Sequence, residues 1–188
     1  MISRFCQAVP VPDTSLQAGR EAAAITREGE LGTKQHRYEV QVVWTGNAGD
    51  GTASWRGYRR DHEIRAAGKP AIDGSSDPAF RGDPARWNPE ELLVASLSAC
   101  HKLWYLGLCA QAGIVVTAYE DAAEGVMAEE TGGAGQFTAV TLRPRVTITA
   151  QDGLQKALDL HHKAHEMCFI ARSVNFPVAC EPVVTVEE

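Results

Sequence analysis

The longest apolar segment of the chain predicts a helix that is buried on most of its sides. Between Leu92 and Ala118 the only fully charged side chain is Lys102. A stretch of this length is long enough to cross a bilayer, but His101 and Lys102 would then lie near the middle of the membrane, where charged groups are costly. We therefore expect a core helix that is covered by a sheet or by another subunit, and no membrane span.

Both ends of this helix carry sequence signals. Asn88 fits the N-cap, Pro89 fits the first helical position, and Glu91 stands where a capping-box glutamate reaches back to the cap. At the other end Gly113 supplies the stop. The helix is predicted to run to about Ala112.

Strand patterns lie on both sides of the helix. Before it, we expect a hairpin of strands at 38–45 and 52–58, a short strand at 61–65, and a long irregular segment rich in Gly and Pro at 66–87. After it, we expect strands at 115–124, 140–150 and 182–186, and a second helix at 153–168. Strands and helices do not alternate regularly, which indicates an α+β fold.

Residues 1–33 show no sustained strand pattern and predict an N-terminal arm, flexible or partly helical, ahead of one domain at 34–188. The first ten residues contain no apolar block of the length that a secretory signal needs, so export is not expected. A chain of 188 residues can bury a core without disulfides.

Charge and cysteine content exclude several classes of protein. The chain has 18 Lys and Arg against 24 Asp and Glu, a net charge of -6, so it lacks the basic surface that binds nucleic acid or an anionic membrane. Five cysteines are an odd number, which leaves at least one free thiol and favours a reducing compartment. We expect a cytoplasmic protein.

The cysteines are the main candidates for chemistry. In the middle of an uncharged helix, Cys100 is by spacing alone more often an inert small hydrophobe. Cys168 follows His161 and His165 on one predicted helix face, where an imidazolium would favour the thiolate. That stripe also suits zinc, but no CxxC or HExxH accompanies it, so we favour a polar face and expect no metal. Cys180 is a further thiol that no neighbour in sequence marks.

Two other enzyme classes are disfavoured by missing motifs. The chain has no GxSxG nucleophile elbow, and its serines near the core helix lie inside that helix, so a serine hydrolase is not expected. The glycine-rich turn at 132–135 lacks the Lys-Ser/Thr that follows a phosphate-binding loop.

Three motifs stand in order along the chain: Asn88–Leu93, Ala99–His101, and Cys168, which follows Cys100 by 68 positions. Together with the segment Asp77–Pro84 they resemble the OsmC/Ohr family of osmotically inducible protein C and the organic hydroperoxide resistance proteins, in particular its OsmC-like branch. The resemblance covers about residues 36–188.

The resemblance implies an OsmC-like α+β fold, in which antiparallel sheets wrap around long central helices in an intertwined homodimer. It also implies a thiol-dependent peroxidase that acts on organic hydroperoxides, including those of fatty acids, without metal, flavin or haem. Cys100 matches the peroxidatic cysteine, which becomes a sulfenic acid. Cys168 matches the resolving cysteine, which forms a disulfide that an external dithiol, with a lipoyl-type compound as one candidate, reopens.

In the family a carboxylate and an arginine support the thiolate. Glu90 matches the carboxylate, and Arg81 is the first choice for the arginine, with Arg60 and Arg86 as alternatives. A regular helix separates Glu90 from Cys100 by about 15 Å. Glu90 therefore either serves the site of a partner subunit or is only a first-turn glutamate that stabilises the helix dipole.

The expected substrate pocket is aromatic and contains Trp87, Trp104, Phe169 and Phe176, although large aromatics are more often simply core. Two other functions stay open. One is a general disulfide reductase that uses the same cysteines, and the other is a non-catalytic dimer that senses redox state or binds a small molecule. The reactivity of the Cys100 thiol separates catalysis from binding.

Overall fold

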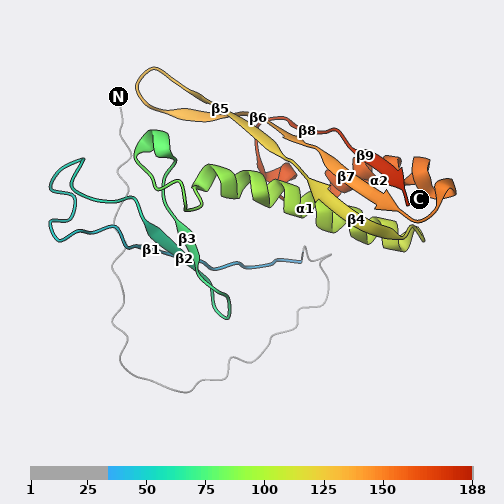
Figure 1. The fold of residues 1–188 in the computed structure, drawn as a ribbon, viewed down its shortest axis with the longest axis horizontal. Coiled ribbons are helices and arrows are strands. Elements are labelled where there is room, and N and C mark those ends of the chain that lie inside the picture. Colours follow the sequence, from blue (N-terminus) through green and yellow to red (C-terminus); the bar gives the residue numbers. More distant parts are fainter. Residues whose placement is uncertain (1–33, 188) are drawn as a thin grey trace, which may run out of the picture. The chain divides into compact units, whose positions relative to one another are not determined.

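A computed structural model describes residues 34–187, and its longest element is helix α1 (Pro89–Gln111) (Figure 1). The Asn88 side chain accepts a hydrogen bond from the Glu91 backbone N–H at 2.7 Å, and the Glu91 carboxylate accepts one from the Asn88 backbone N–H at 3.2 Å. Gly113 follows the helix with a φ of 75°, which a residue without Cβ adopts readily. The predicted helix is confirmed at both ends.

Nine strands form three sheets of three strands each among the described residues. The first sheet contains β1 (Gln41–Trp44), β2 (His62–Arg65) and β3 (Ile72–Gly74). The second has the order β4 (Val116–Asp121), β7 (Pro144–Ile148) and β9 (Val183–Val186). The third has the order β5 (Glu124–Glu129), β6 (Gly135–Leu142) and β8 (Val178–Cys180). The remaining elements are helix α2 (Leu154–Met167) and the short 3₁₀ helices η1 (Pro78–Phe80), η2 (Gln151–Gly153) and η3 (Ala171–Ser173).

The first sheet is antiparallel as expected, but the two C-terminal sheets are mixed, so the expectation of antiparallel sheets is wrong for them. Strand β6 pairs with β8 in parallel, and β7 pairs with β9 in parallel. Helix α2 follows β7 and precedes β8 in the chain. Two parallel strands need a long crossover connection between them, and α2 is part of the connection for both parallel pairs. The α+β class itself is confirmed, and the N-terminal arm expected at 1–33 lies outside the described residues.

The hairpin expected at 38–58 is wrong in its second strand. The partner of β1 is β2, in the register Trp44 opposite His62, and residues 52–58 form turns. Their aromatic side chains have another role, because the Arg60 guanidinium lies 4.5 Å from the ring centre of Trp55 and 4.1 Å from that of Tyr58. The irregular segment at 66–87 also contains the short strand β3, which the Gly-rich sequence concealed.

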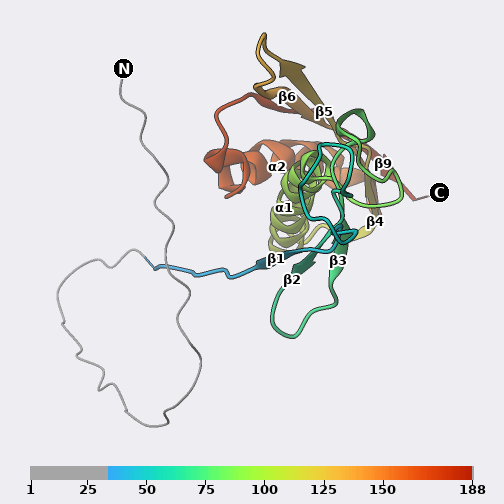
Figure 2. The same cartoon turned by 90° about the vertical axis from the view of Figure 1, so that its left-hand side faces the viewer.

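The core lies between α1, α2 and the two C-terminal sheets (Figure 2). One cluster joins Tyr105 and Cys109 of α1 to Val146 and Ile148 of β7 and to small residues of α2. A second cluster contains Leu97, Val140 and Leu142. Both clusters meet α1 along the stripe that also holds His101, with a spacing of four residues, so this chain buries only one side of the helix.

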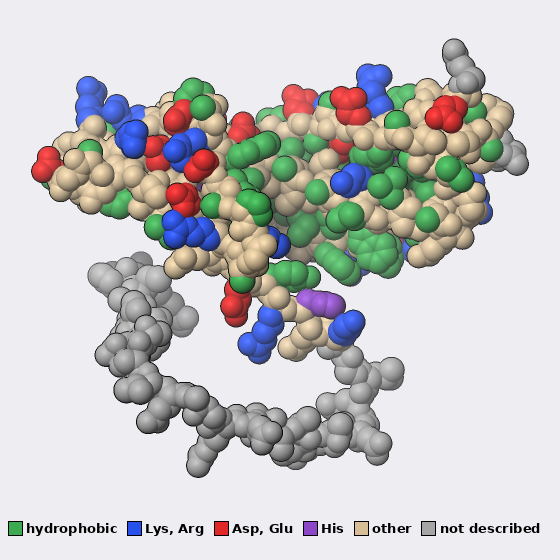
Figure 3. Space-filling view, turned by 60° about the horizontal axis from the view of Figure 1, so that its bottom comes forward, with side chains coloured by type: hydrophobic (Ala, Val, Ile, Leu, Met, Phe, Trp, Pro, Cys, Tyr) green, Lys and Arg blue, Asp and Glu red, His purple; other side chains and the backbone are tan. Residues whose placement is uncertain are grey.

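The other side of α1 is open. Only 22% of its most apolar 18-residue stretch is buried, and Leu103 is 67% exposed. Figure 3 views this side and shows hydrophobic side chains gathered on it. By length and composition α1 is also apolar enough to cross a membrane. The core helix of a soluble protein can have the same length and composition. The expected burial on most sides is therefore not achieved within one chain.

Replacement of the α1 cap tests the contribution of the capping box. We expect Asn88→Ala to lower the free energy of unfolding by about 1 kcal/mol, because the backbone N–H of Glu91 loses its acceptor. Urea unfolding followed by circular dichroism measures the change. Asn88→Ser retains an acceptor and should stay close to wild type. Equal stability of the Ala and Ser variants would contradict the assignment.

Candidate active site

Packing of α2 against α1 brings the thiols of Cys100 and Cys168 together. Cys168 is the C-cap of α2, is 1% exposed, and lies close enough to Cys100 for the two thiols to interact. The backbone N–H of Ala171 also donates to its sulfur at 3.4 Å. Both cysteines are free thiols. The two residues that the sequence singled out thus form one site, although they are 68 positions apart in the chain.

The two thiols have different surroundings. Cys100 is half-buried and Cys168 is buried. Burial, followed by the hydrogen bond with Cys100, raises the pKa of Cys168 to about 11, so this thiol stays protonated at neutral pH. A reagent that approaches from solvent therefore meets Cys100 first.

Two of the four expected pocket aromatics lie next to each other near this pair. The rings of Trp104 and Phe169 meet edge to face at 5.6 Å. Trp104 stands one helical turn after Cys100, and Phe169 follows Cys168 directly. The other two lie elsewhere in this chain, since Phe176 packs in the second core cluster and Trp87 precedes α1.

The three candidate arginines differ in what holds their side chains. The Arg86 guanidinium pairs with Asp73 at 3.2 Å and with Asp83 at 3.8 Å. That of Arg60 is held over two aromatic rings. Arg81 is exposed, caps η1 with a φ of 70°, and takes part in none of the ion pairs of residues 34–187. Only Arg81 keeps its charge available.

Glu90 lies away from the cysteine pair. Its Oε2 is buried and has no hydrogen-bond partner among the described residues. Ten residues of α1 separate it from Cys100, about 15 Å along the helix axis. A buried carboxylate oxygen without a donor is costly, so Glu90 has an unmet need for a positively charged or N–H partner.

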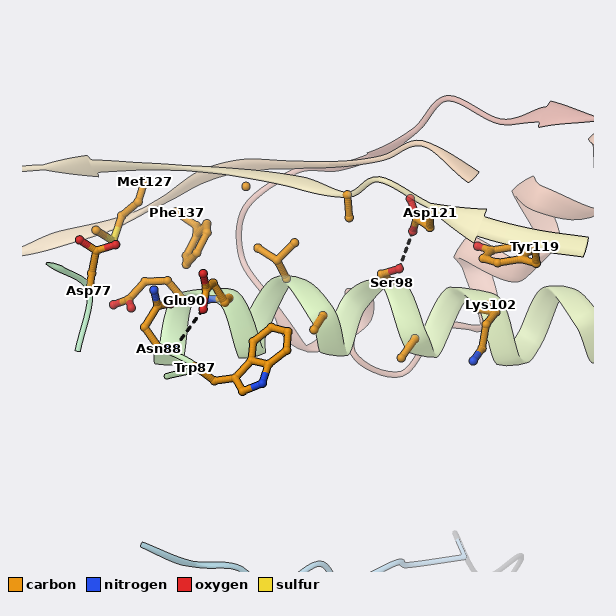
Figure 4. Close-up of a pocket in the computed structure, with 16 residues that line it drawn as sticks. Asp77, Trp87, Asn88, Glu90, Ser98, Lys102, Tyr119, Asp121, Met127 and Phe137 are labelled. Atoms are coloured by element: carbon orange, nitrogen blue, oxygen red, sulfur yellow. Dashed lines mark hydrogen bonds between the residues drawn. The ribbon is translucent and has the colours of Figure 1, made fainter. Parts of the chain in front are cut away.

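Glu90 lines a cavity of about 720 Å³ between α1 and strands β4, β5 and β6 (Figure 4). Inside it Ser98 donates a hydrogen bond to Asp121, whose other oxygen accepts from the Arg143 backbone N–H at 2.7 Å. Neither Cys100 nor Cys168 lines it. Sequence reasoning missed this cavity, although polar residues at 98 and 102 of an apolar helix are a weak signal of it.

A second polar cluster was also missed. His101 of α1, His161 of α2 and Cys180 of β8 place three side-chain atoms within 4.8 Å of one another. Burial lowers the pKa of His101 to about 4 and that of His161 to about 3, so both imidazoles are neutral. The expected stripe of His161, His165 and Cys168 therefore divides, because Cys168 meets Cys100 whereas His161 meets His101.

The raised pKa of Cys168 predicts slow alkylation. At pH 7 a pKa of about 11 leaves roughly 100-fold less thiolate than an ordinary cysteine has, and the fraction rises about tenfold per pH unit up to that pKa. We expect iodoacetamide to label Cys168 far more slowly in native protein than in urea, with a rate that increases through pH 9. Peptide mass spectrometry measures both rates. Equally fast labelling at pH 7 in the two states would refute the assignment.

Comparison with known proteins agrees with this geometry. The family model described as OsmC-like protein matches residues 82–182. A solved OsmC-like protein of unknown function from Vibrio cholerae is 33% identical, covers 79% of this chain and 100% of its own, and superposes with a TM-score of 0.71. No curated protein matches the chain.

More distant structures share the fold. Organic hydroperoxide resistance proteins from Elizabethkingia anophelis and Legionella pneumophila are each 17% identical and superpose with a TM-score of 0.55. The alignments cover 82% and 80% of this chain, and 100% and 99% of theirs. The resemblance noted in the sequence is thus confirmed, and the chain belongs to the OsmC-like protein family.

Proposed function

We propose that the protein is a thiol-dependent peroxidase that reduces organic hydroperoxides, with Cys100 as the peroxidatic and Cys168 as the resolving cysteine. The observation that carries the proposal is the side-chain contact between these two free thiols. Two neighbouring thiols need little movement to form a disulfide, and these two lie where helices α1 and α2 pack together.

The chemistry balances without a cofactor. The Cys100 thiolate attacks the terminal peroxide oxygen, the O–O bond breaks, and the alkoxide leaves as an alcohol after taking up a proton. Cys100 becomes a sulfenic acid. The Cys168 sulfur then attacks the Cys100 sulfur and displaces water to form the disulfide. An external dithiol reduces it by exchange and returns both thiols. Such a cycle requires a reducing compartment, which fits a cytoplasmic protein.

The roles follow from exposure. The peroxidatic thiol must be reached by substrate, and Cys100 is the more accessible of the two. The resolving thiol should not compete for peroxide, and burial keeps Cys168 protonated by raising its pKa. Trp104 and Phe169 offer an apolar wall for the hydrocarbon part of the substrate, so alkyl or fatty-acid hydroperoxides suit the site better than hydrogen peroxide.

A cation beside Cys100 has to stabilise the thiolate, and we assign it to Arg81 with Glu90 as its partner. Of the three candidates, Arg81 is the one whose guanidinium is held neither by an ion pair nor by aromatic rings within residues 34–187, and Glu90 has a buried oxygen without a donor, so each supplies what the other lacks. The distance along α1 prevents Glu90 from supporting Cys100 of its own chain. The pair would therefore serve the site of a second subunit, which makes the active protein a homodimer.

The peroxidase cycle is tested by mass and free-thiol count after one equivalent of cumene hydroperoxide. Wild type should lose two hydrogens and form a disulfide between Cys100 and Cys168. Cys168→Ser should stop at an oxidised Cys100, and Cys100→Ser should remain unchanged, because the remaining Cys168 thiol is buried and protonated.

A known thiol peroxidase treated in parallel serves as the positive control. If it is oxidised while all thiols of the protein survive, the peroxidase assignment fails and a binding or sensing dimer takes its place. Oxidation by protein disulfides that is faster than oxidation by peroxide would instead identify a general disulfide reductase.

The homodimer is tested on the open side of α1. Leu103 is 67% exposed there, so we expect Leu103→Glu to place a charge in the dimer contact and shift wild-type dimer toward monomer. Analytical ultracentrifugation measures the masses. Gln111→Glu adds the same charge at the exposed end of the same helix and should remain dimeric. A monomeric wild type, or an unaffected Leu103→Glu, would contradict this use of the surface.

A further inference from the structure

We propose that His101, His161 and Cys180 form a binding site for a transition-metal ion of the Zn²⁺ type. This site does not use the Cys100 and Cys168 thiols and does not depend on the peroxidase proposal. Its three ligands come from α1, α2 and β8, at positions 60 and 79 residues apart for the pairs that touch. Known metal-binding motifs do not span such separations in sequence, so the sequence analysis predicted no metal site here.

Two of the three separations between the donor atoms match a tetrahedral site, and the third is within 4.8 Å. His101 Nε2 lies 3.0 Å from His161 Nδ1 and 3.6 Å from Cys180 Sγ. With Zn–N bonds of about 2.0 to 2.1 Å and a Zn–S bond of about 2.3 Å, tetrahedral angles give N···N edges of about 3.3 Å and N···S edges of about 3.5 Å. Both observed separations lie within a few tenths of an ångström of these edges.

The histidine pair is not satisfied as a purely structural pair. His101 is fully buried and His161 is 2% exposed. One hydrogen bond joins their facing nitrogens, yet His101 Nδ1 and His161 Nε2 have no partner among the described residues. These are the outer nitrogens of the two rings and not the proposed ligand atoms, so one of them is free to take up the proton that coordination displaces from between the facing nitrogens.

Metal binding changes the protons in a defined way. In the metal-free protein one proton lies between the facing nitrogens, and the planes of the two rings are almost parallel, at 7°. Coordination moves that proton to an outer nitrogen, tilts the rings toward the ion, and releases the thiol proton of Cys180 to solvent. A thiolate and two neutral imidazoles then bind the ion, and the fourth position is left to water.

The surroundings favour a cation. Asp121 is close enough to act electrostatically on both His101 and Cys180, and its negative charge offsets part of the positive charge of the bound ion. Tyr105 stacks on the His161 ring at 3.8 Å between centres and restrains its orientation. Sulfur and imidazole ligands suit Zn²⁺ better than Mg²⁺ or Ca²⁺, which prefer oxygen.

Cobalt spectroscopy tests the site in the reduced, chelator-treated full-length chain. We expect one Co²⁺ per chain with a thiolate-to-cobalt charge-transfer band in the near ultraviolet and the visible bands of tetrahedral Co²⁺, and Zn²⁺ should displace it. Cys180→Ser should lose the charge-transfer band. His161→Gln should weaken Co²⁺ binding by more than ~100-fold, the upper end of what loss of a supporting hydrogen bond costs.

The matched control is the double variant Cys100→Ser with Cys168→Ser, which should keep the band in full. The proposal is overturned if wild type shows no such band, or if the band survives Cys180→Ser and disappears in the double variant. A second readout needs no substitution: Zn²⁺ should protect Cys180 of wild type from alkylation in peptide mass spectrometry, and unchanged labelling of Cys180 would also overturn the site.

Discussion

The packing of α2 against α1 is the contact on which the rest of the structure depends. It closes the larger core cluster, in which small residues of α2 allow Tyr105 to lie directly on the His161 ring. The same contact brings Cys168 to Cys100 and His161 to His101. A single helix pair therefore positions both groups of potentially reactive side chains, and a shift of α2 along α1 would separate both at once.

Burial at this contact determines the protonation states of Cys168, His101 and His161. Desolvation disfavours charge, so it keeps the Cys168 thiol protonated and the two histidines neutral. Within this one environment, Cys100 differs in being partly exposed at its edge. An arrangement with one reachable thiol, one protected thiol and a neutral imidazole pair behind them is difficult to explain as apolar packing alone.

The open side of α1 imposes the second constraint. A helix that is apolar on nearly every side buries only one stripe within this chain, and the buried Oε2 of Glu90 has no donor. Exposed apolar surface of this kind and an unpaired buried carboxylate both cost free energy in water. The second subunit that we propose would cover the apolar side of α1 and offer a donor to Glu90, and this is the physical argument for the proposed homodimer.

The sequence by itself determined the local structure. Caps and glycines fixed α1 to within one residue, apolar periodicity located α2 and most strands, and the motifs around Cys100 and Cys168 identified the family. Only the tertiary structure decided which strands pair in parallel, why residues 52–58 form turns around Arg60, and that His101, His161 and Cys180 meet. The physical reason is that caps and periodicity act between residues a few positions apart, whereas these contacts depend on how helices and sheets pack over large separations in the chain.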